Sequence, residues 1–191
     1  MELTASQLIK LYMQTQVVIG NMYYAPTPEA RLLDALNGLA DRGPVKKGKF
    51  LELSDVQMMH LDGKQEKLKQ SYINKSTIQL AVTLGDANCG RGIGAQEGAK
   101  SYPYVEKTPV PVRIETENYI VTGFMHSIIS QGIWSVLEEG FTFLPLTRAQ
   151  INTKLNGDRE NLPFVAVNKE HILSLQELDG KDKHIVSKDK S

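Results

Sequence analysis

The chain has 191 residues, enough for one large domain or two small ones. Its 22 basic and 22 acidic residues cancel, so there is no long-range field to attract nucleic acid or an anionic membrane. The single cysteine excludes an intramolecular disulfide, and the first residues lack the basic start and apolar run of a signal peptide. No apolar stretch approaches the ~20 residues that a membrane-spanning helix needs. We therefore expect a cytoplasmic, soluble protein with no membrane association.

The first predicted element is a β-hairpin. Residues 8–13 and 17–23 carry apolar side chains at strand spacing and flank a polar turn, Gln14-Thr15-Gln16. Gly20 lies inside the second strand, where glycine indicates a bulge or a bend. A capping box at Thr4-Ala5-Ser6-Gln7 would instead start a short helix. We favour the strand because the same pattern recurs later in the chain.

The elements after the hairpin are short. Residues 30–38 predict one or two helical turns stopped by glycine. A strand follows at 49–53, a less regular one at 56–61, and the last strands of this half lie within 70–82. Four to five short strands at this spacing predict a small antiparallel barrel.

The order of these elements repeats in the second half of the chain. Residues 10–80 and 113–175 share a hairpin with a glycine in its second strand, a Phe-Leu-x-Leu strand and an apolar-Asn-Lys turn followed by isoleucine. In the second copy the glycine, the helical turn, the strand and the Asn-Lys turn are Gly123, 133–140, 142–146 and 167–169. A duplication indicates two similar domains, and two small cores favour mutual packing or self-association.

The predicted domain boundaries follow from the repeat. The first barrel covers 1–84, a glycine-rich linker or long loop covers 85–108, and the second barrel covers 109–178. Residues 179–191 form a polar tail that we expect to be disordered. The linker lacks P-loop spacing, because Gly98-Ala99-Lys100-Ser101 has an extra alanine.

The sequence gives no positive indication of an enzyme. The four histidines and the lone cysteine lack metal-ligand spacing, so no metal or cofactor is expected. The duplicated Asn74-Lys75 and Asn168-Lys169 have two interpretations. Each is a turn between the last two strands, with the following isoleucine inside the barrel, or each presents a lysine to a phosphate or a carboxylate.

These residues, in this order, resemble the Sm-like small-barrel family. The resemblance implies a mainly β fold of two tandem Sm-like, SH3-like small antiparallel barrels with short helical turns in the connectors. It also implies assembly through edge strands and single-stranded RNA at a pore. The candidate binding residues that it marks are Asp34, Asn37, Asn74, Lys75, Asn168 and Lys169. The second copy departs from the pattern, because Ser135 and Glu138 stand where the family has Asp and Asn.

We expect a non-enzymatic tandem-barrel protein that acts as a protein-interaction or assembly module, through self-association or a protein partner. One alternative is an Sm-like protein that binds single-stranded RNA through Asn37, Lys75 and Lys169. The balanced charge weakens this alternative, because phosphate neutralisation dominates RNA affinity. A second alternative is a small-molecule sensor or enzyme with a site between the barrels.

Overall fold

The computed structural model describes residues 5–24, 32–38, 48–85, 107–128 and 132–179. This part of the chain is mainly β, as predicted. The chain divides into two compact units, Met1–Gly98 and Ala99–Ser191, and the division falls inside the expected 85–108 connector. Most of that connector and the predicted tail beyond Asp179 lie outside the described residues, so linker flexibility and tail disorder stay predictions.

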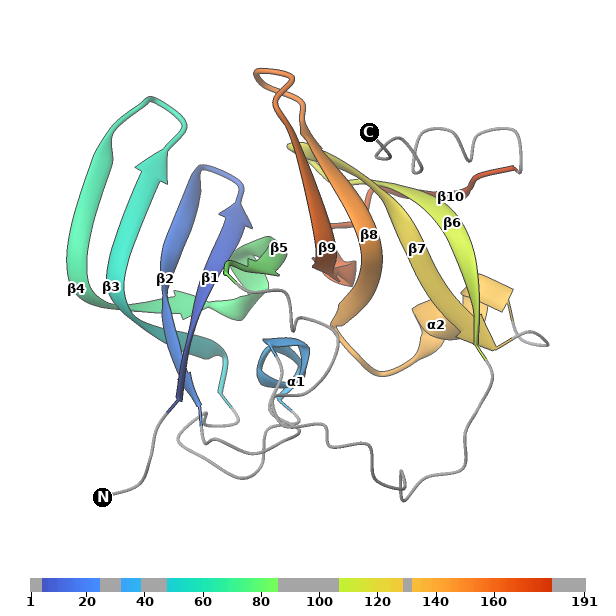
Figure 1. The fold of residues 1–191 in the computed structure, drawn as a ribbon, viewed down its shortest axis with the longest axis horizontal. Helices are drawn as coiled ribbons and strands as arrows, with labels where there is room; N and C mark the ends of the chain where they lie inside the picture. The colour runs from blue at the N-terminus through green and yellow to red at the C-terminus, as the bar shows by residue number, and fades with distance from the viewer. Residues whose placement is uncertain (1–4, 25–31, 39–47, 86–106, 129–131, 180–191) are drawn as a thin grey trace. The chain divides into compact units, whose positions relative to one another are not determined.

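Unit 1 is an antiparallel sheet with the strand order β5-β1-β2-β3-β4 (Figure 1). Its elements in chain order are β1 (Ala5–Met13), β2 (Gln16–Tyr24), α1 (Leu32–Asn37), β3 (Phe50–His60), β4 (Gln65–Asn74), the 3-10 turn η1 (Lys75–Thr77) and β5 (Ile78–Thr83). The predicted hairpin is confirmed as β1 and β2, and the capping box does not start a helix. The predicted helical turn is α1.

Unit 2 repeats this arrangement with the order β10-β6-β7-β8-β9. Its elements are β6 (Lys107–Glu115), β7 (Tyr119–Ile128), α2 (Gly132–Glu138), β8 (Phe143–Thr153), β9 (Arg159–Asn168), the 3-10 turn η2 (Lys169–His171) and β10 (Ser174–Glu177). In both units the 3-10 turn carries the chain from one end of the strand order to the other. No described pairing joins β4 to β5 or β9 to β10, so neither described sheet is closed into a barrel.

The third strand of each unit corrects the sequence prediction of two separate strands. Residues 50–60 form one strand, β3, and residues 143–153 form one strand, β8. The apparent break is a bulge, because the β2–β3 register shifts between Ile19 and Asn21. At this bulge Asp55 has a φ of 49°, and Arg148 takes a φ of 48° at the matching place in β8. An extra residue interrupts the alternation of side chains, which explains why the pattern broke there.

The two duplicated glycines lie where the neighbouring strand approaches closely. A Cβ atom on Gly20 would be 3.2 Å from the Leu53 Cβ, and one on Gly123 would be 3.2 Å from the Ala149 Cα. The bulge presses the third strand against this point of the second strand. The sequence predicts a bulge or a bend at these glycines, and the register shifts at Gly20 and Gly123 show a bulge, where close approach of the strands favours glycine.

Each unit has its own apolar core between the curved strands and the helical turn. The largest fully buried side chains of unit 1 are Ile9, Leu11, Leu53, Ile78 and Leu80. Those of unit 2 are Ile114, Tyr119, Met125, Phe143, Leu144, Leu146 and Ile151. Full burial of such a side chain contributes roughly 1.5–3 kcal/mol to the free energy of unfolding.

Candidate functional site

The two Asn-Lys turns are built alike. Asn74 precedes η1, and its side-chain Oδ1 accepts a hydrogen bond from the Ser76 backbone N–H at 3.1 Å. Asn168 precedes η2, and its Oδ1 accepts from the Glu170 backbone N–H at 3.0 Å. An asparagine oxygen at this position satisfies an N–H that the first turn of a helix leaves without a partner. The turn interpretation of the duplicated segment is therefore the one that the local geometry supports.

The lysine of each turn reaches the helical connector of its own unit. The Lys75 Nζ donates to the Ala35 carbonyl oxygen at 2.6 Å, and the Lys75 side chain is buried. The Lys169 Nζ donates to the Leu137 carbonyl at 2.9 Å and also to the Glu139 carbonyl. The last carbonyls of a helix lack intrahelical donors, so a lysine there stabilises the helix end. Burial lowers the pKa of Lys75.

These contacts bring together the candidate residues of unit 1. Asp34 and Asn37 lie on α1, on either side of Ala35, and Lys75 is bonded to Ala35 from the turn after β4. This hydrogen bond joins the helix to the Asn-Lys turn in the described structure. The ammonium group, however, is directed at a backbone carbonyl. Lys75 is only 8% exposed, so this ammonium group is poorly placed to contact an external phosphate.

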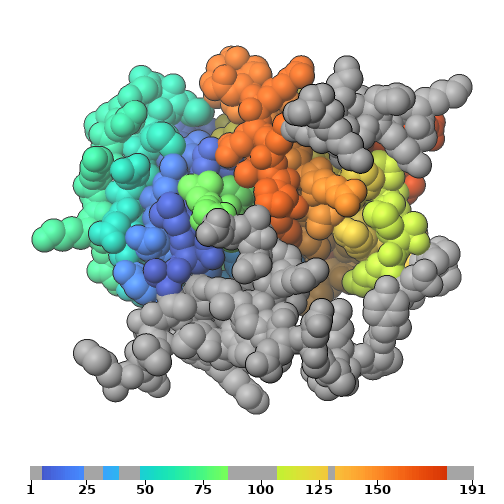
Figure 2. Space-filling view, in the orientation of Figure 1, coloured from blue at the N-terminus to red at the C-terminus, as the bar shows by residue number. Residues whose placement is uncertain are grey.

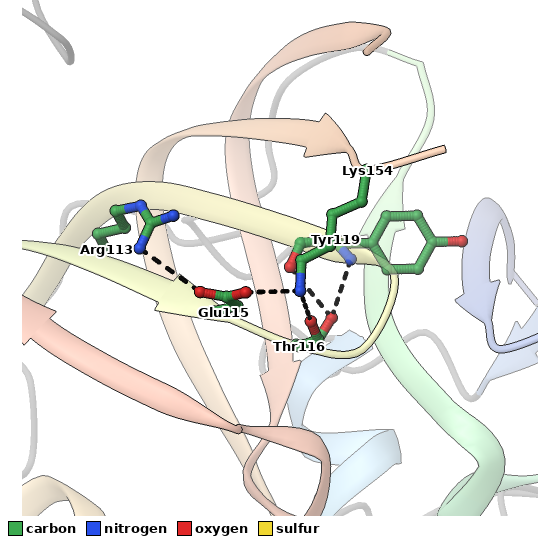
Figure 3. A network of polar contacts seen from close by, with 5 residues as sticks. All are labelled: Arg113, Glu115, Thr116, Tyr119 and Lys154. Atoms are coloured by element: carbon green, nitrogen blue, oxygen red, sulfur yellow. Dashed lines mark hydrogen bonds and ion pairs between the residues drawn. The ribbon is translucent and has the colours of Figure 1, made fainter. Parts of the chain in front are cut away.

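Unit 2 has a second cluster of polar groups, at the end of the β6–β7 hairpin (Figure 3). The Lys154 Nζ donates to the Glu115 Oε1 and to the Thr116 carbonyl, both at 2.7 Å, and Arg113 lies 3.6 Å from the other Glu115 oxygen. The hydrogen bond from Lys154 holds the pKa of Glu115 below its usual range. Burial raises the pKa of Tyr119 to about 12. The cluster ties the hairpin to the end of β8, which is a structural role.

The surface of β3 and β4 carries aromatic side chains that the sequence analysis did not single out. Phe50 is 55% exposed and Tyr72 is 61% exposed. Beside them the Gln70 Nε2 donates to the Tyr72 hydroxyl at 3.0 Å and also to the Glu52 carboxylate. The second hydrogen bond joins β4 to β3. β4 is also the last strand in the order of unit 1, so its outer backbone edge has no described partner strand. Figure 2 shows the β3–β4 segment, in teal, at the molecular surface.

A sequence signal for this aromatic surface did exist. Phe50 precedes Leu51 and Leu53, which are both buried, and strand alternation therefore turns Phe50 away from the core. Tyr72 lies opposite Glu52 in the β3–β4 register, so it shares a face with that exposed carboxylate. Pairing between these strands is a long-range feature, which the sequence alone did not define.

No group of three or more histidine, cysteine, aspartate and glutamate side chains within the described ranges could hold a metal ion. Among the helices described, none combines the length and the hydropathy needed to cross a membrane. Comparison of the chain with protein-family models, with curated proteins and with solved structures found no match. The function is therefore inferred from the geometry of the chain itself.

Proposed function

We propose that the chain is a non-enzymatic protein-interaction module, made of two Sm-like small barrels in tandem. The strand order of each unit, the 3-10 turn between the fourth and fifth strands and the bulge in the third strand support the small-barrel description. The hydrogen bond from Lys75 to a helix carbonyl supports a structural role for this turn. The RNA alternative instead needs Lys75 to bind a phosphate.

The observation that carries the proposal is the exposed aromatic surface at the edge of unit 1. Phe50 and Tyr72 are exposed on β3 and β4, and the outer edge of β4 pairs with no strand in the described part of the chain. Exposed edge strands bind other chains by adding a strand to the sheet, and side-chain pockets next to the edge give selectivity. Tyrosine is enriched among the residues that dominate binding energy at protein interfaces. The combination of backbone edge and aromatic anchors fits a protein ligand.

The proposal is tested by replacing both aromatic residues with serine, as Phe50→Ser/Tyr72→Ser. The full-length chain is examined by light scattering for self-association and by affinity capture for a bound protein that is then identified and purified. Leu155→Ser is the matched control, because Leu155 is 63% exposed but lies at the β8–β9 turn of unit 2. We expect protein binding, to itself or to the identified partner, that the double variant weakens and the control retains.

Two outcomes would overturn this proposal. One is a strict monomer that captures no protein. The other is a protein complex that the Phe50→Ser/Tyr72→Ser variant forms as tightly as the unaltered chain. Circular dichroism of both variants establishes that the sheet is retained, which it should be because the replaced side chains are exposed.

A further inference from the structure

Three strands of unit 2 bring basic side chains together on the outer face of the sheet. The His126 Nε2 on β7 lies 2.9 Å from the Thr147 Oγ1 on β8. The register pairs His126 with Pro109, two residues along β6 from Lys107, so Lys107 is a diagonal neighbour of His126 on the same face. Arg148 follows Thr147 directly in β8. We call Lys107, His126 and Arg148 the basic patch.

The bulge in β8 is what adds Arg148 to this face. Leu146 and Ala149 are both buried, while Thr147 is partly exposed and Arg148 is exposed. In a regular strand, alternation would turn only one of two successive residues outward. The extra residue of the bulge, which lies where the β7–β8 register shifts, therefore places Arg148 beside Thr147 and His126.

The fold itself does not require a cation at this bulge. Arg148 has a φ of 48°, and the matching residue of unit 1 is Asp55 with a φ of 49°. Asp55 accepts a hydrogen bond from the Asn21 side chain at 3.4 Å. Aspartate and asparagine adopt this left-handed region more readily than arginine does, because their short polar side chains bond locally. An arginine kept in a costly conformation is typical of a functional position.

The charge of the basic patch is not neutralised by a carboxylate of the described chain. Neither Lys107 nor Arg148 forms an ion pair with a described acidic residue. Burial lowers the pKa of His126, and the positive charges of Lys107 from β6 and Arg148 from β8 lower it further. The helix α2 also packs against β7, but its acid, Glu138, is not among the charges that act on His126. A bound anion would relieve the repulsion among these groups.

We propose that the basic patch binds an oxyanion of the phosphate class, either free or as the phosphoryl group of a small monoester. This site is separate from the aromatic surface of unit 1. Lys107 offers an ammonium group and Arg148 offers a planar guanidinium fork, and both form strong charge-assisted hydrogen bonds to phosphate oxygens. A phosphate group presents more oxygens than a carboxylate does, so it accepts from more of these donors at once.

His126 supplies the third donor. A Thr147 hydroxyl that donates to the Phe124 carbonyl, 3.5 Å away, can only accept from the His126 Nε2–H. No described group bonds the other ring nitrogen, Nδ1. When the ring is protonated, Nδ1 gains a hydrogen that it can donate to the anion. Binding of the anion and protonation of His126 should therefore favour one another.

The test titrates the full-length chain with inorganic phosphate, and with sodium chloride at equal ionic strength to measure screening alone. NMR of the histidine ring signals follows the pKa of His126, whose signal is assigned by its loss in His126→Gln. We expect phosphate to raise this pKa and to raise Tm, because the anion binds the folded state. Acetate should have a smaller effect than phosphate. Glycerol phosphate distinguishes the two sources, since tighter binding than that of inorganic phosphate assigns a monoester and weaker binding assigns the free ion.

Arg148→Gly separates ligand binding from folding. Glycine adopts a positive φ at no steric cost, so this variant should lose no stability in urea unfolding. It should bind phosphate about tenfold more weakly, because it lacks the charge-assisted hydrogen bonds of the guanidinium group. Lys107→Gln, at the exposed start of β6, should also weaken binding and leaves the bulge intact. Arg159→Gln is the matched control, because it removes the same charge from an exposed position on β9, opposite Asn152.

Three results would overturn the inference. The first is an equal shift in the pKa of His126 with phosphate and with chloride at the same ionic strength. The second is phosphate binding by Arg148→Gly and Lys107→Gln that is as tight as binding by Arg159→Gln. The third is equal affinity for acetate and phosphate, which would contradict the assignment of the ligand to the phosphate class.

Discussion

Replacing Lys75 with methionine is expected to destabilise unit 1 by about 1–3 kcal/mol. The Lys75 Nζ lies 2.6 Å from the Ala35 carbonyl oxygen, and Lys75 is only 8% exposed. Methionine keeps most of the aliphatic packing but provides no donor, so the Ala35 carbonyl loses its short bond and keeps only the longer one from the Gly38 N–H at 3.4 Å. Removing the buried charge offsets part of this loss, because burial already disfavours the ammonium form and lowers its pKa.

The measurement is thermal unfolding of the full-length chain, combined with hydrogen exchange at the helical connector. For a unit of this size each kcal/mol lowers Tm by roughly 4–8 °C. Exchange should accelerate first in α1, because the hydrogen bond from Lys75 holds the end of that helix. Lys49→Met is the control, since Lys49 is exposed and only its backbone carbonyl contacts the turn, through the Lys75 N–H at 2.8 Å.

An unchanged Tm and unchanged exchange in α1 after Lys75→Met would refute the assignment of this lysine to the helix end. The same variant separates the structural interpretation from the RNA alternative. If Lys75 contacted RNA phosphate, Lys75→Met would reduce RNA affinity and flatten its salt dependence. We expect no such effect.

Three further predictions concern unit 2. Gly123→Ala should lower the free energy of unfolding in urea by about 1–3 kcal/mol, because the alanine Cβ would lie 3.2 Å from backbone and side-chain atoms of the neighbouring strand. Gly140→Ala is the control, because a Cβ there meets open space and should change the stability little. Equal effects of the two substitutions would contradict the close approach at Gly123. The folded-state pKa of Glu115 is depressed, so the stability that this group contributes is present above the ordinary glutamate pKa and is lost as the pH falls through the folded-state pKa. Lys154→Met should reduce this acid-induced loss of stability when Tm is measured against pH. An unchanged profile of Tm against pH would argue against the Lys154–Glu115 pair. Asn168→Ala should cost about 0.5–2 kcal/mol in the same unfolding assay, since a fully buried asparagine caps η2; no loss would show that the cap is dispensable.

The elements that the sequence predicted correctly are those with a local physical cause. Gly20 and Gly123 indicated a bulge or a bend because glycine inside a strand permits an approach that a Cβ would obstruct. The Asn-Lys segments indicated turns because an asparagine side chain caps the next residues of its own chain. The helical connector of unit 1 was likewise visible from its apolar spacing and its terminal Gly38.

The features that the sequence missed depend on contacts distant along the chain. A bulge at Asp55 or Arg148 interrupts the period of two, and the interruption resembles a gap between strands. The Lys75 side chain was a plausible phosphate ligand until its hydrogen bond to Ala35, forty positions away, was visible. The contrast between exposed Tyr72 and buried Ala166, which each lie two residues before the asparagine of the repeated turn, has no counterpart in local sequence, because burial depends on what covers a strand.

The most direct test of the interaction module is backbone hydrogen exchange of the full-length chain, followed residue by residue as its concentration is raised. The account predicts that protection increases along β4, Gln65–Asn74, while α1 exchanges at an unchanged rate. Association accompanied by no added protection in β4 would contradict the central claim that this open edge is the binding element.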